Sequence, residues 1–334
     1  MHTLLSRDTA IGYGILLLLL VALRIPVIID PVHYTLADRP ELYTPLWSYV
    51  FGWAGVGTWA SVLVAIIATA ICCLIVNNME NVYSLVREPG CLTGFAFVVL
   101  SGGFRMSMGL HPVMIYAICL SLSIDRMYSA MKKERPSRSI FWSAAWATLG
   151  ALFWAKGVWF LPFLLVMLFV LRVGNGRTLM AGMLGMLSIG VNMLTCMMLT
   201  SPAPLETLEA YWHAMFATVP FWSLGLRSGA YLTVMGIIIV ASVLAMRSRQ
   251  TQQGVVESRR LQMVEWYIMF VTGLVLLPGF SYEMQILMAL GVSMSFPHLM
   301  SGIRSEGMRN VTMLMMIAVT AWYEWTTQLQ IVAK

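Results

Sequence analysis

The stretch Ile140-Phe-Trp-Ser-Ala-Ala-Trp-Ala-Thr-Leu-Gly-Ala-Leu-Phe-Trp-Ala-Lys156-Gly-Val-Trp-Phe-Leu-Pro, which continues to Leu171, spans 32 residues and holds one charged side chain, Lys156. One membrane-spanning helix takes about 20 apolar residues, so this stretch is too long for one crossing and short for two. The same holds for Cys91–Ile124, which has 34 residues and carries Arg105 near its middle. Each stretch therefore needs an arrangement other than one simple span.

The loop between these two stretches decides which arrangement to expect. Asp125–Arg138 carries five basic residues, and Lys and Arg collect in the cytoplasmic loops of membrane proteins. Both stretches must then cross outward and return, which predicts two hairpins of helices about 13–16 residues long, or roughly 20–24 Å. Helices this short cannot span a hydrocarbon core of about 30 Å.

The hairpin tips, with Arg105 and Lys156, should therefore lie within the outer leaflet. Irregular backbone at that depth requires surrounding protein or a water-filled cavity. We expect a cavity that opens to the outer face.

The whole composition is that of a membrane protein. Of 334 residues, 59% are hydrophobic and 11% charged, with a mean hydropathy of +0.78, whereas soluble domains carry about 25% charged residues. Apolar runs near 20 residues recur, beginning with Ala10–Ile29, which has no cleavage site before Arg24 and reads as a retained first helix. A second helix is expected from Trp47 to about Val76, ended by the polar run Asn77–Asn81, and Thr178–Leu199 is a further expected span. The sequence predicts an all-α, polytopic integral membrane helix bundle of about eleven transmembrane helices, forming one domain over residues 1–334.

The distribution of charge predicts the orientation. With the N-terminus in the cytoplasm, 15 of the 21 Lys and Arg residues fall on the cytoplasmic side. The net charge of +6 is then a consequence of topology, and no nucleic-acid partner is expected.

Ionisable residues on the outer side are the candidates for function, because charged groups at membrane depth cost free energy and are retained mainly where they act. They are dense from Arg24 to Trp47, the segment that follows the first helix. Asp30 is the candidate catalytic base. Cations suit an anionic group such as a lipid phosphate. The predicted substrate-binding residues are Arg24, His33, Arg105, His111, Lys156 and Arg227.

Structural roles compete with these assignments. Arg24, Arg105 and Lys156 would also suit snorkelling or internal ion pairs, and Asp30-Pro31 is a common turn element. The histidines would also serve as hydrogen-bonded interface residues. No HxxH, HExxH, DxD or phosphate-loop motif occurs, so we expect no metal site and no cofactor.

The layout over Ala10–Leu171 resembles the GT-C glycosyltransferases, in particular the protein mannosyltransferase-like branch. The resemblance rests on a first helix that ends in a loop with Asp30, on two short hairpins, and on a Gly-rich helix followed by Lys156-Gly157. It implies sugar transfer from a polyprenyl-phosphate donor in the outer leaflet, with Asp30 as base and Lys156 and Arg105 as phosphate contacts. Residues 172–334 would add further transmembrane helices.

The whole chain also resembles a family of polytopic inner-membrane proteins from Bacteroidetes, through its Asn81–Pro89 loop and its Asp125-Arg126-Met-Tyr segment. This second resemblance implies a multi-pass location in the bacterial inner membrane and no particular reaction. Two other functions stay open: a transporter or flippase of lipid-linked substrates, and a non-catalytic membrane subunit of an envelope complex. The expected partners are membrane lipid with a polyprenyl-phosphate-linked sugar, or an envelope protein.

Overall fold

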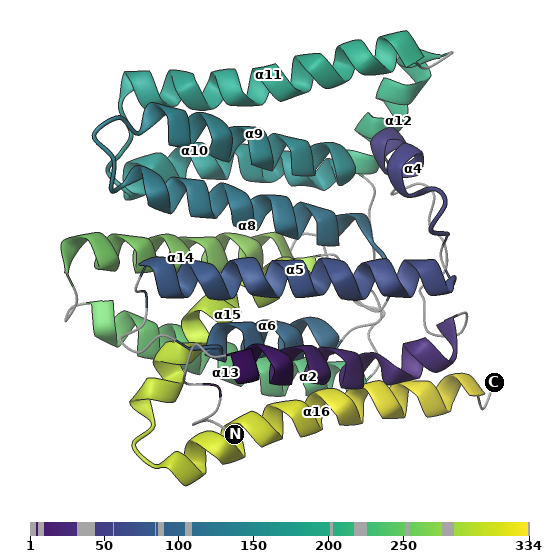
Figure 1. Cartoon of the computed structure of the whole chain (residues 1–334), viewed down its shortest axis with the longest axis vertical. Coiled ribbons are helices and arrows are strands. Elements are labelled where there is room, and N and C mark those ends of the chain that lie inside the picture. The colour runs from purple at the N-terminus through teal and green to yellow at the C-terminus, as the bar shows by residue number, and fades with distance from the viewer. Residues whose placement is uncertain are drawn as a thin grey trace. The chain divides into compact units, whose positions relative to one another are not determined.

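The computed structural model describes residues 5, 10–31, 44–55, 57–83, 85, 90–103, 109–200, 203–216, 226–250, 254–275 and 284–332, without the side chains of residues 45, 197, 200, 226–230, 232 and 324–332. Within these ranges, thirteen α-helices and one short 3-10 helix are the only regular elements (Figure 1). The prediction of an all-α fold is confirmed.

Five helices of the described chain are long and apolar enough to cross a membrane. They are α2 (Ala10–Ile29), α5 (Trp59–Tyr83), α8 (Pro112–Ala130), and the segments Gly176–Cys196 and Thr233–Gln250 of two further helices. The bounds of α2 match the predicted first span. The larger number of about eleven spans, and their topology, stay predictions.

The helices form two compact units that alternate along the chain. Unit 1 consists of Met1–Ala37, Ala54–His111 and Pro220–Lys334, and unit 2 of Asp38–Trp53 and Pro112–Val219. Each unit has its own packing.

Unit 1 is built around two buried helices. Its members are α2, α5, α6 (Leu92–Gly102), α13 (Leu226–Gln250), α14 (Val255–Val275), α15 (Met284–Gly302) and α16 (Glu306–Val332). Every residue of α6 is buried, as are most of α15. These two helices pack together, with Phe95 and Phe296 in ring contact at 6.2 Å. Helices α2, α5 and α16 cover α6, while α13 and α14 pack on α15.

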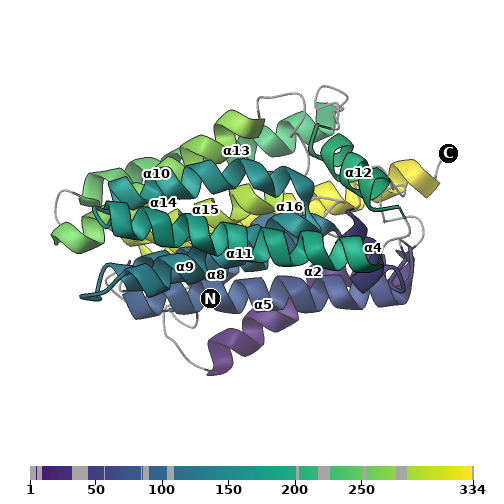
Figure 2. The same ribbon diagram turned by 90° about the horizontal axis from the view of Figure 1, so that it is seen from above.

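Unit 2 is a bundle of helices with three short elements at one end. Its members are α4 (Pro45–Phe51), α8, α9 (Ser137–Phe153), the 3-10 helix η2 (Ala155–Trp159), α10 (Phe160–Val170), α11 (Gly176–Thr200) and α12 (Pro204–Phe216). The helix α9 packs against both α8 and α11. Figures 1 and 2 show α12 crossing the end of α11 instead of running along the bundle.

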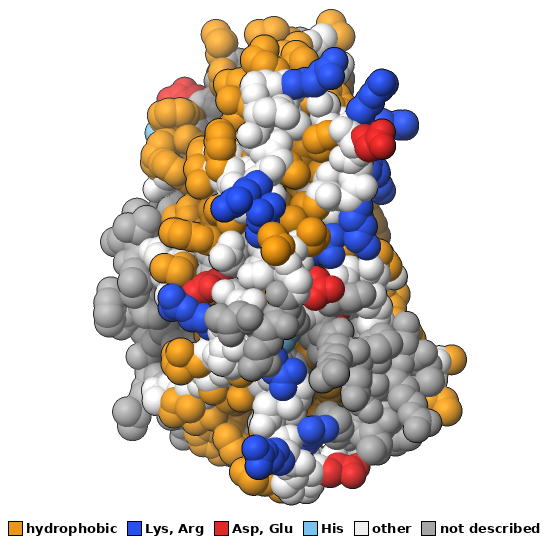
Figure 3. Space-filling model, turned by 90° about the vertical axis from the view of Figure 1, so that its left-hand side faces the viewer, with side chains coloured by type: hydrophobic (Ala, Val, Ile, Leu, Met, Phe, Trp, Pro, Cys, Tyr) orange, Lys and Arg blue, Asp and Glu red, His pale blue; other side chains and the backbone are white. Residues whose placement is uncertain are grey.

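The opposite end of unit 2 is basic. The loop between α8 and α9 and the loop between α10 and α11 both lie there (Figure 1), and Lys and Arg side chains gather on the corresponding face in Figure 3. The basic residues of these two loops and their flanks are Arg126, Lys132, Lys133, Arg135, Arg138, Arg172 and Arg177. This is the charge distribution that the positive-inside rule requires at a cytoplasmic end.

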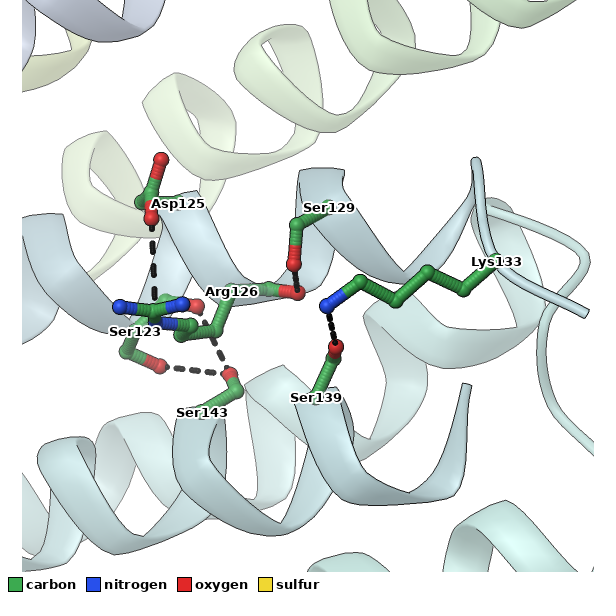
Figure 4. Close-up of polar contacts among 7 residues, drawn as sticks. All are labelled: Ser123, Asp125, Arg126, Ser129, Lys133, Ser139 and Ser143. Atoms are coloured by element: carbon green, nitrogen blue, oxygen red, sulfur yellow. Dashed lines mark hydrogen bonds and ion pairs between the residues drawn. The ribbon is translucent and has the colours of Figure 1, made fainter. Parts of the chain in front are cut away.

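Serines bind α8 to α9 beside this basic end. The hydroxyl groups of Ser123 and Ser143 are 2.9 Å apart, and the Ser143 hydroxyl also donates to the Ser123 carbonyl at 2.8 Å (Figure 4). In the loop itself, the Lys133 ammonium donates to Ser139 Oγ at 3.0 Å. These bonds hold two antiparallel helices in register where a purely apolar contact would allow them to slide.

The two helices of the first predicted hairpin differ in length from the expected value of about 13–16 residues, since α6 has 11 and α8 has 19. They belong to different compact units, and their pairing stays a prediction. The second predicted hairpin agrees better with the structure, because α9 ends at Phe153 and α10 packs back against it.

The predicted second helix, from Trp47 to about Val76, is wrong at both ends. The segment Gly52–Thr58 separates α4 from α5, and Gly57 adopts a φ of 80°, which side chains with a Cβ rarely tolerate. At the other end, α5 continues to Tyr83 through the polar residues that were expected to end it.

Candidate functional site

The break between α9 and α10 places Lys156 inside unit 2. Trp154 leaves the helical conformation with φ −131° and ψ 102°, and η2 follows before α10 begins at Phe160. Lys156 is 1% exposed. It lies three residues beyond the end of α9, where the helix carbonyls carry partial negative charge and favour a cation. The structure thus confirms that the helical stretch is broken near Lys156 and adds that this side chain is buried.

Hydroxyl groups from three other segments satisfy the backbone of this turn. Tyr211 of α12 donates to the Ala151 carbonyl at 2.9 Å, and Thr44 donates to the Phe153 carbonyl at 3.0 Å. Tyr116 of α8 donates to the Gly157 carbonyl at 3.2 Å. The end of a helix leaves carbonyls without intrahelical partners, and irregular backbone at membrane depth must be satisfied locally. From the sequence, either protein or a water-filled cavity could surround the irregular backbone near Lys156. For these three carbonyls, the hydrogen-bond donors come from the protein.

Burial also shapes the chemistry of one of these donors. Burial raises the pKa of Tyr211 above the usual value for tyrosine. Its hydroxyl therefore stays protonated, and able to donate to Ala151, at alkaline pH values where an exposed tyrosine ionises.

Two glycines let Tyr116 lie against the turn. A Cβ at Gly157 would come within 2.5 Å of the ring, and one at Gly150 within 2.8 Å. The ring itself contacts Trp154 and Phe160, with centroids 5.1 and 5.5 Å away. The glycines of the Gly-rich helix and the Lys-Gly pair thus have a packing role, which holds whatever Lys156 binds.

In unit 1, Arg24 is fully buried in α2. Its Nη2 donates to Thr69 Oγ1 of α5 at 3.4 Å, and the same hydroxyl donates to the Ala65 carbonyl at 2.8 Å. The guanidinium therefore does not snorkel to the surface of the unit. It joins two helices that are both apolar enough to cross a membrane.

Asp30 follows the last residue of α2 and is half-buried. Its backbone N–H donates to the Pro26 carbonyl at 3.1 Å, which continues the helical pattern to the start of the next segment. This agrees with the expected helix end. The role of Asp30 as a base stays a prediction.

The remaining predicted ligands are placed as follows. His111 is half-buried and directly precedes α8. His33, Arg105 and the side chain of Arg227 lie outside the described residues. Arg24, Asp30 and His111 belong to unit 1, whereas Lys156 belongs to unit 2. The common cavity expected for the hairpin tips therefore stays a prediction.

Sequence reasoning missed a polar contact at the start of α6. Cys91, at the N-cap of α6, makes no side-chain capping bond. Two side chains of α5 take this role: Asn77 Oδ1 accepts the Gly94 N–H at 3.3 Å, and Glu80 accepts the Thr93 N–H. Asn77 and Glu80 are three residues apart and therefore share one helix face. This pair of polar residues on one face was the feature of the sequence that could have indicated the contact.

A buried cation closes the same end of α5. The Nη1 of Arg260, from α14, donates to the Tyr83 carbonyl at 3.0 Å, and its guanidinium lies 4.9 Å from the centre of the Tyr83 ring. The cation–π contact and the carbonyl bond of Arg260 are those of a buried structural arginine.

Metal ligation has no candidate group among the residues that the structure describes, because no three His, Cys, Asp or Glu side chains cluster there. Comparison of the chain with protein-family models, with curated proteins and with solved structures found no match.

Proposed function

We propose that the chain is a multi-pass protein of the bacterial inner membrane that binds the phosphate of a lipid-linked sugar at Lys156 and transfers the sugar on the outer side. The membrane location is supported by five helices of spanning length and apolarity. The orientation is supported by the basic loops at one end of unit 2, since cytoplasmic loops are enriched in Lys and Arg.

The observation that carries the proposal is the buried Lys156 at the broken helix, just beyond the end of α9, whose other end begins at a basic loop. An ammonium group at membrane depth is expensive and is usually retained for function. The turn that carries Lys156 packs on the ring of Tyr116, which also contacts Trp154. In such aromatic, low-dielectric surroundings a charge-assisted bond to phosphate is stronger than in water.

The transfer step needs a general base for the acceptor and a cation for the leaving phosphate. An acceptor hydroxyl attacks the anomeric carbon of the sugar, and the bond from that carbon to the phosphate oxygen breaks. The hydroxyl proton goes to a general base, the role that the sequence predicts for Asp30. The polyprenyl phosphate leaves with the electron pair of the broken bond, and the Lys156 ammonium stabilises its negative charge.

The test is direct binding of polyprenyl-phosphate sugars to the purified protein in lipid nanodiscs. We expect Lys156→Met to weaken binding roughly 10- to 100-fold, because a hydrogen bond to a charged group is lost. Lys156→Arg should retain part of the affinity. Lys132→Met, at the basic end of the same unit, is the matched control and should bind as the wild type.

Transfer is measured separately from binding. Asp30→Asn should bind the donor and fail to release polyprenyl phosphate in the presence of acceptor. A wild-type protein that binds no polyprenyl-phosphate sugar would overturn the proposal. Binding without any transfer would support the transporter or the non-catalytic subunit instead.

A further inference from the structure

The helix α12 has three separate faces. At about 100° per residue, Thr207, Tyr211 and Ala214 fall in one sector, which faces the bundle: Ala214 is buried and Tyr211 bonds to the Ala151 carbonyl. A second sector, about 80° wide, holds four exposed apolar side chains. They are Leu205, Leu208, Trp212 and Phe216.

The third face of α12 is polar. It carries Glu206, Glu209 and His213, and His213 lies 3.5 Å from Glu209 with both side chains exposed. An exposed apolar stripe beside an exposed polar stripe is the pattern of a helix that lies in a membrane interface. A helix in water would bury its apolar stripe, and one that spans the membrane would not carry the polar one.

The connection to α11 places this pattern beside a membrane span. Residues Gly176–Cys196 of α11 form a candidate span, and only three residues separate the end of α11 at Thr200 from the start of α12 at Pro204. Figures 1 and 2 show α12 crossing the end of α11, so it turns away from the spanning direction where the span stops.

We infer that α12 lies flat in the lipid interface at the end of unit 2 opposite the basic loops, with Leu205, Leu208, Trp212 and Phe216 in the acyl-chain boundary. The occupant of this face is therefore lipid. Anchoring here depends on apolar area and on the aromatic rings, which favour the interface. The polar face has no Lys or Arg, so attraction to anionic headgroups plays no part, in contrast to basic interfacial helices.

This position bears on Lys156. The helix α12 packs on η2, and Phe216 contacts Trp159 edge-on at 6.1 Å between ring centroids. A helix in the interface would therefore hold the Lys156 turn close to the depth of the lipid phosphates. This last step rests on the proposed function, whereas the position of α12 does not.

The test is a cysteine scan of α12 with spin labels in phosphatidylcholine vesicles. The background is Cys196→Ser, because Cys72, Cys73, Cys91 and Cys119 are buried and Cys196 is exposed. Labels replace Leu205, Leu208, Trp212 and Phe216 one at a time, with Glu206→Cys, Glu209→Cys and His213→Cys as matched controls on the polar face. Collision rates with oxygen and with a water-soluble nickel chelate report the depth of each label.

We expect the four apolar positions to favour oxygen, at depths of about 5–10 Å, and the three polar positions to favour the nickel chelate. Equal access of the chelate to all seven labels would overturn the inference, because α12 would then lie in water. Protection of the apolar four from both reagents would also overturn it, since a protein would then cover that face. A failure of donor binding at Lys156 would leave these depths unchanged and would count only against the proposed function.

Discussion

Tyr116 illustrates how single residues shape the turn that carries Lys156. Its hydroxyl satisfies the Gly157 carbonyl, and its ring fills the space that Gly150 and Gly157 leave open. Buried side chains in well-packed interiors tolerate little added volume. The glycines at positions 150 and 157 therefore have a packing explanation at the scale of one aromatic ring.

The change Gly157→Ala tests this packing. The added methyl group would meet Tyr116 Cε2 at 2.5 Å, and Trp154 and Phe160 restrict the movement of the ring. We expect a loss of about 1–3 kcal/mol, measured as a lower unfolding midpoint of the purified protein. The control is Gly190→Ala in α11, where a Cβ meets nothing within 4 Å and alanine is the better helix former. Equal midpoints for both variants would contradict the packing role.

Glu80 gives a second prediction at the scale of one residue. Because it accepts the buried Thr93 N–H, Glu80→Leu should leave that donor without its acceptor and cost about 1–3 kcal/mol. Glu80→Gln keeps an acceptor oxygen at this position, so it should cost less than the leucine variant. Thermal unfolding of both variants in the same detergent decides the matter, and a glutamine variant as unstable as the leucine one would refute the capping role.

At the scale of elements, the broken helix between α9 and α10 is held by segments far from it in sequence. Thr44, Tyr116 and Tyr211 reach the turn from the start of α4, from α8 and from α12. Each provides one hydroxyl to one carbonyl. A break of this kind is stable because its exposed backbone groups are bonded within the unit, as the low dielectric of a membrane requires.

Removal of one hydroxyl should loosen the turn locally. We expect Tyr211→Phe to leave the Ala151 carbonyl without this donor, which costs about 1 kcal/mol or more and speeds hydrogen exchange of the amides in residues 154–159. Tyr49→Phe is the control, since Tyr49 is exposed on α4 of the same unit. Unchanged exchange at residues 154–159 in Tyr211→Phe would show that the bond does not hold the turn.

At the scale of the molecule, each unit contributes candidate spans: α2, α5 and part of α13 in unit 1, and α8 with part of α11 in unit 2. The two basic loops of unit 2 lie at one end, and α12, which carries Glu206 and Glu209, lies at the other (Figure 1). A membrane protein inserts with its Lys-rich and Arg-rich loops in the cytoplasm. We therefore expect α12 to face outward.

Labelling of cysteines in spheroplasts tests this orientation. In the Cys196→Ser background, Glu209→Cys should react with a membrane-impermeant maleimide on intact spheroplasts. Lys132→Cys should react only after lysis. Permeabilised spheroplasts, in which both positions should label, are the control for reactivity. The reverse pattern would invert the proposed topology and move Lys156 to the cytoplasmic side.

Comparison of the sequence predictions with the structure shows which features local composition can predict. The first helix was predicted over Ala10–Ile29 and is observed over the same residues, and α11 differs from its prediction by at most two residues at either end. Apolar runs of this kind are local properties. The end of α5 was predicted too early, because polar residues such as Asn77 and Glu80 usually end an apolar helix. In the structure they stay within α5 and accept hydrogen bonds from the first backbone N–H groups of α6.

The sequence by itself determined the helical class, several of the apolar helices and the basic loops, because hydrophobicity and charge add up along a local stretch whatever surrounds it. Only the tertiary structure decided what the polar residues inside those helices do. Arg24 pairs with Thr69, Glu80 caps α6, and Tyr116 and Tyr211 complete the turn around Lys156. A buried polar group is stable only with a partner of the right geometry, and these partners come from helices that are distant in the sequence.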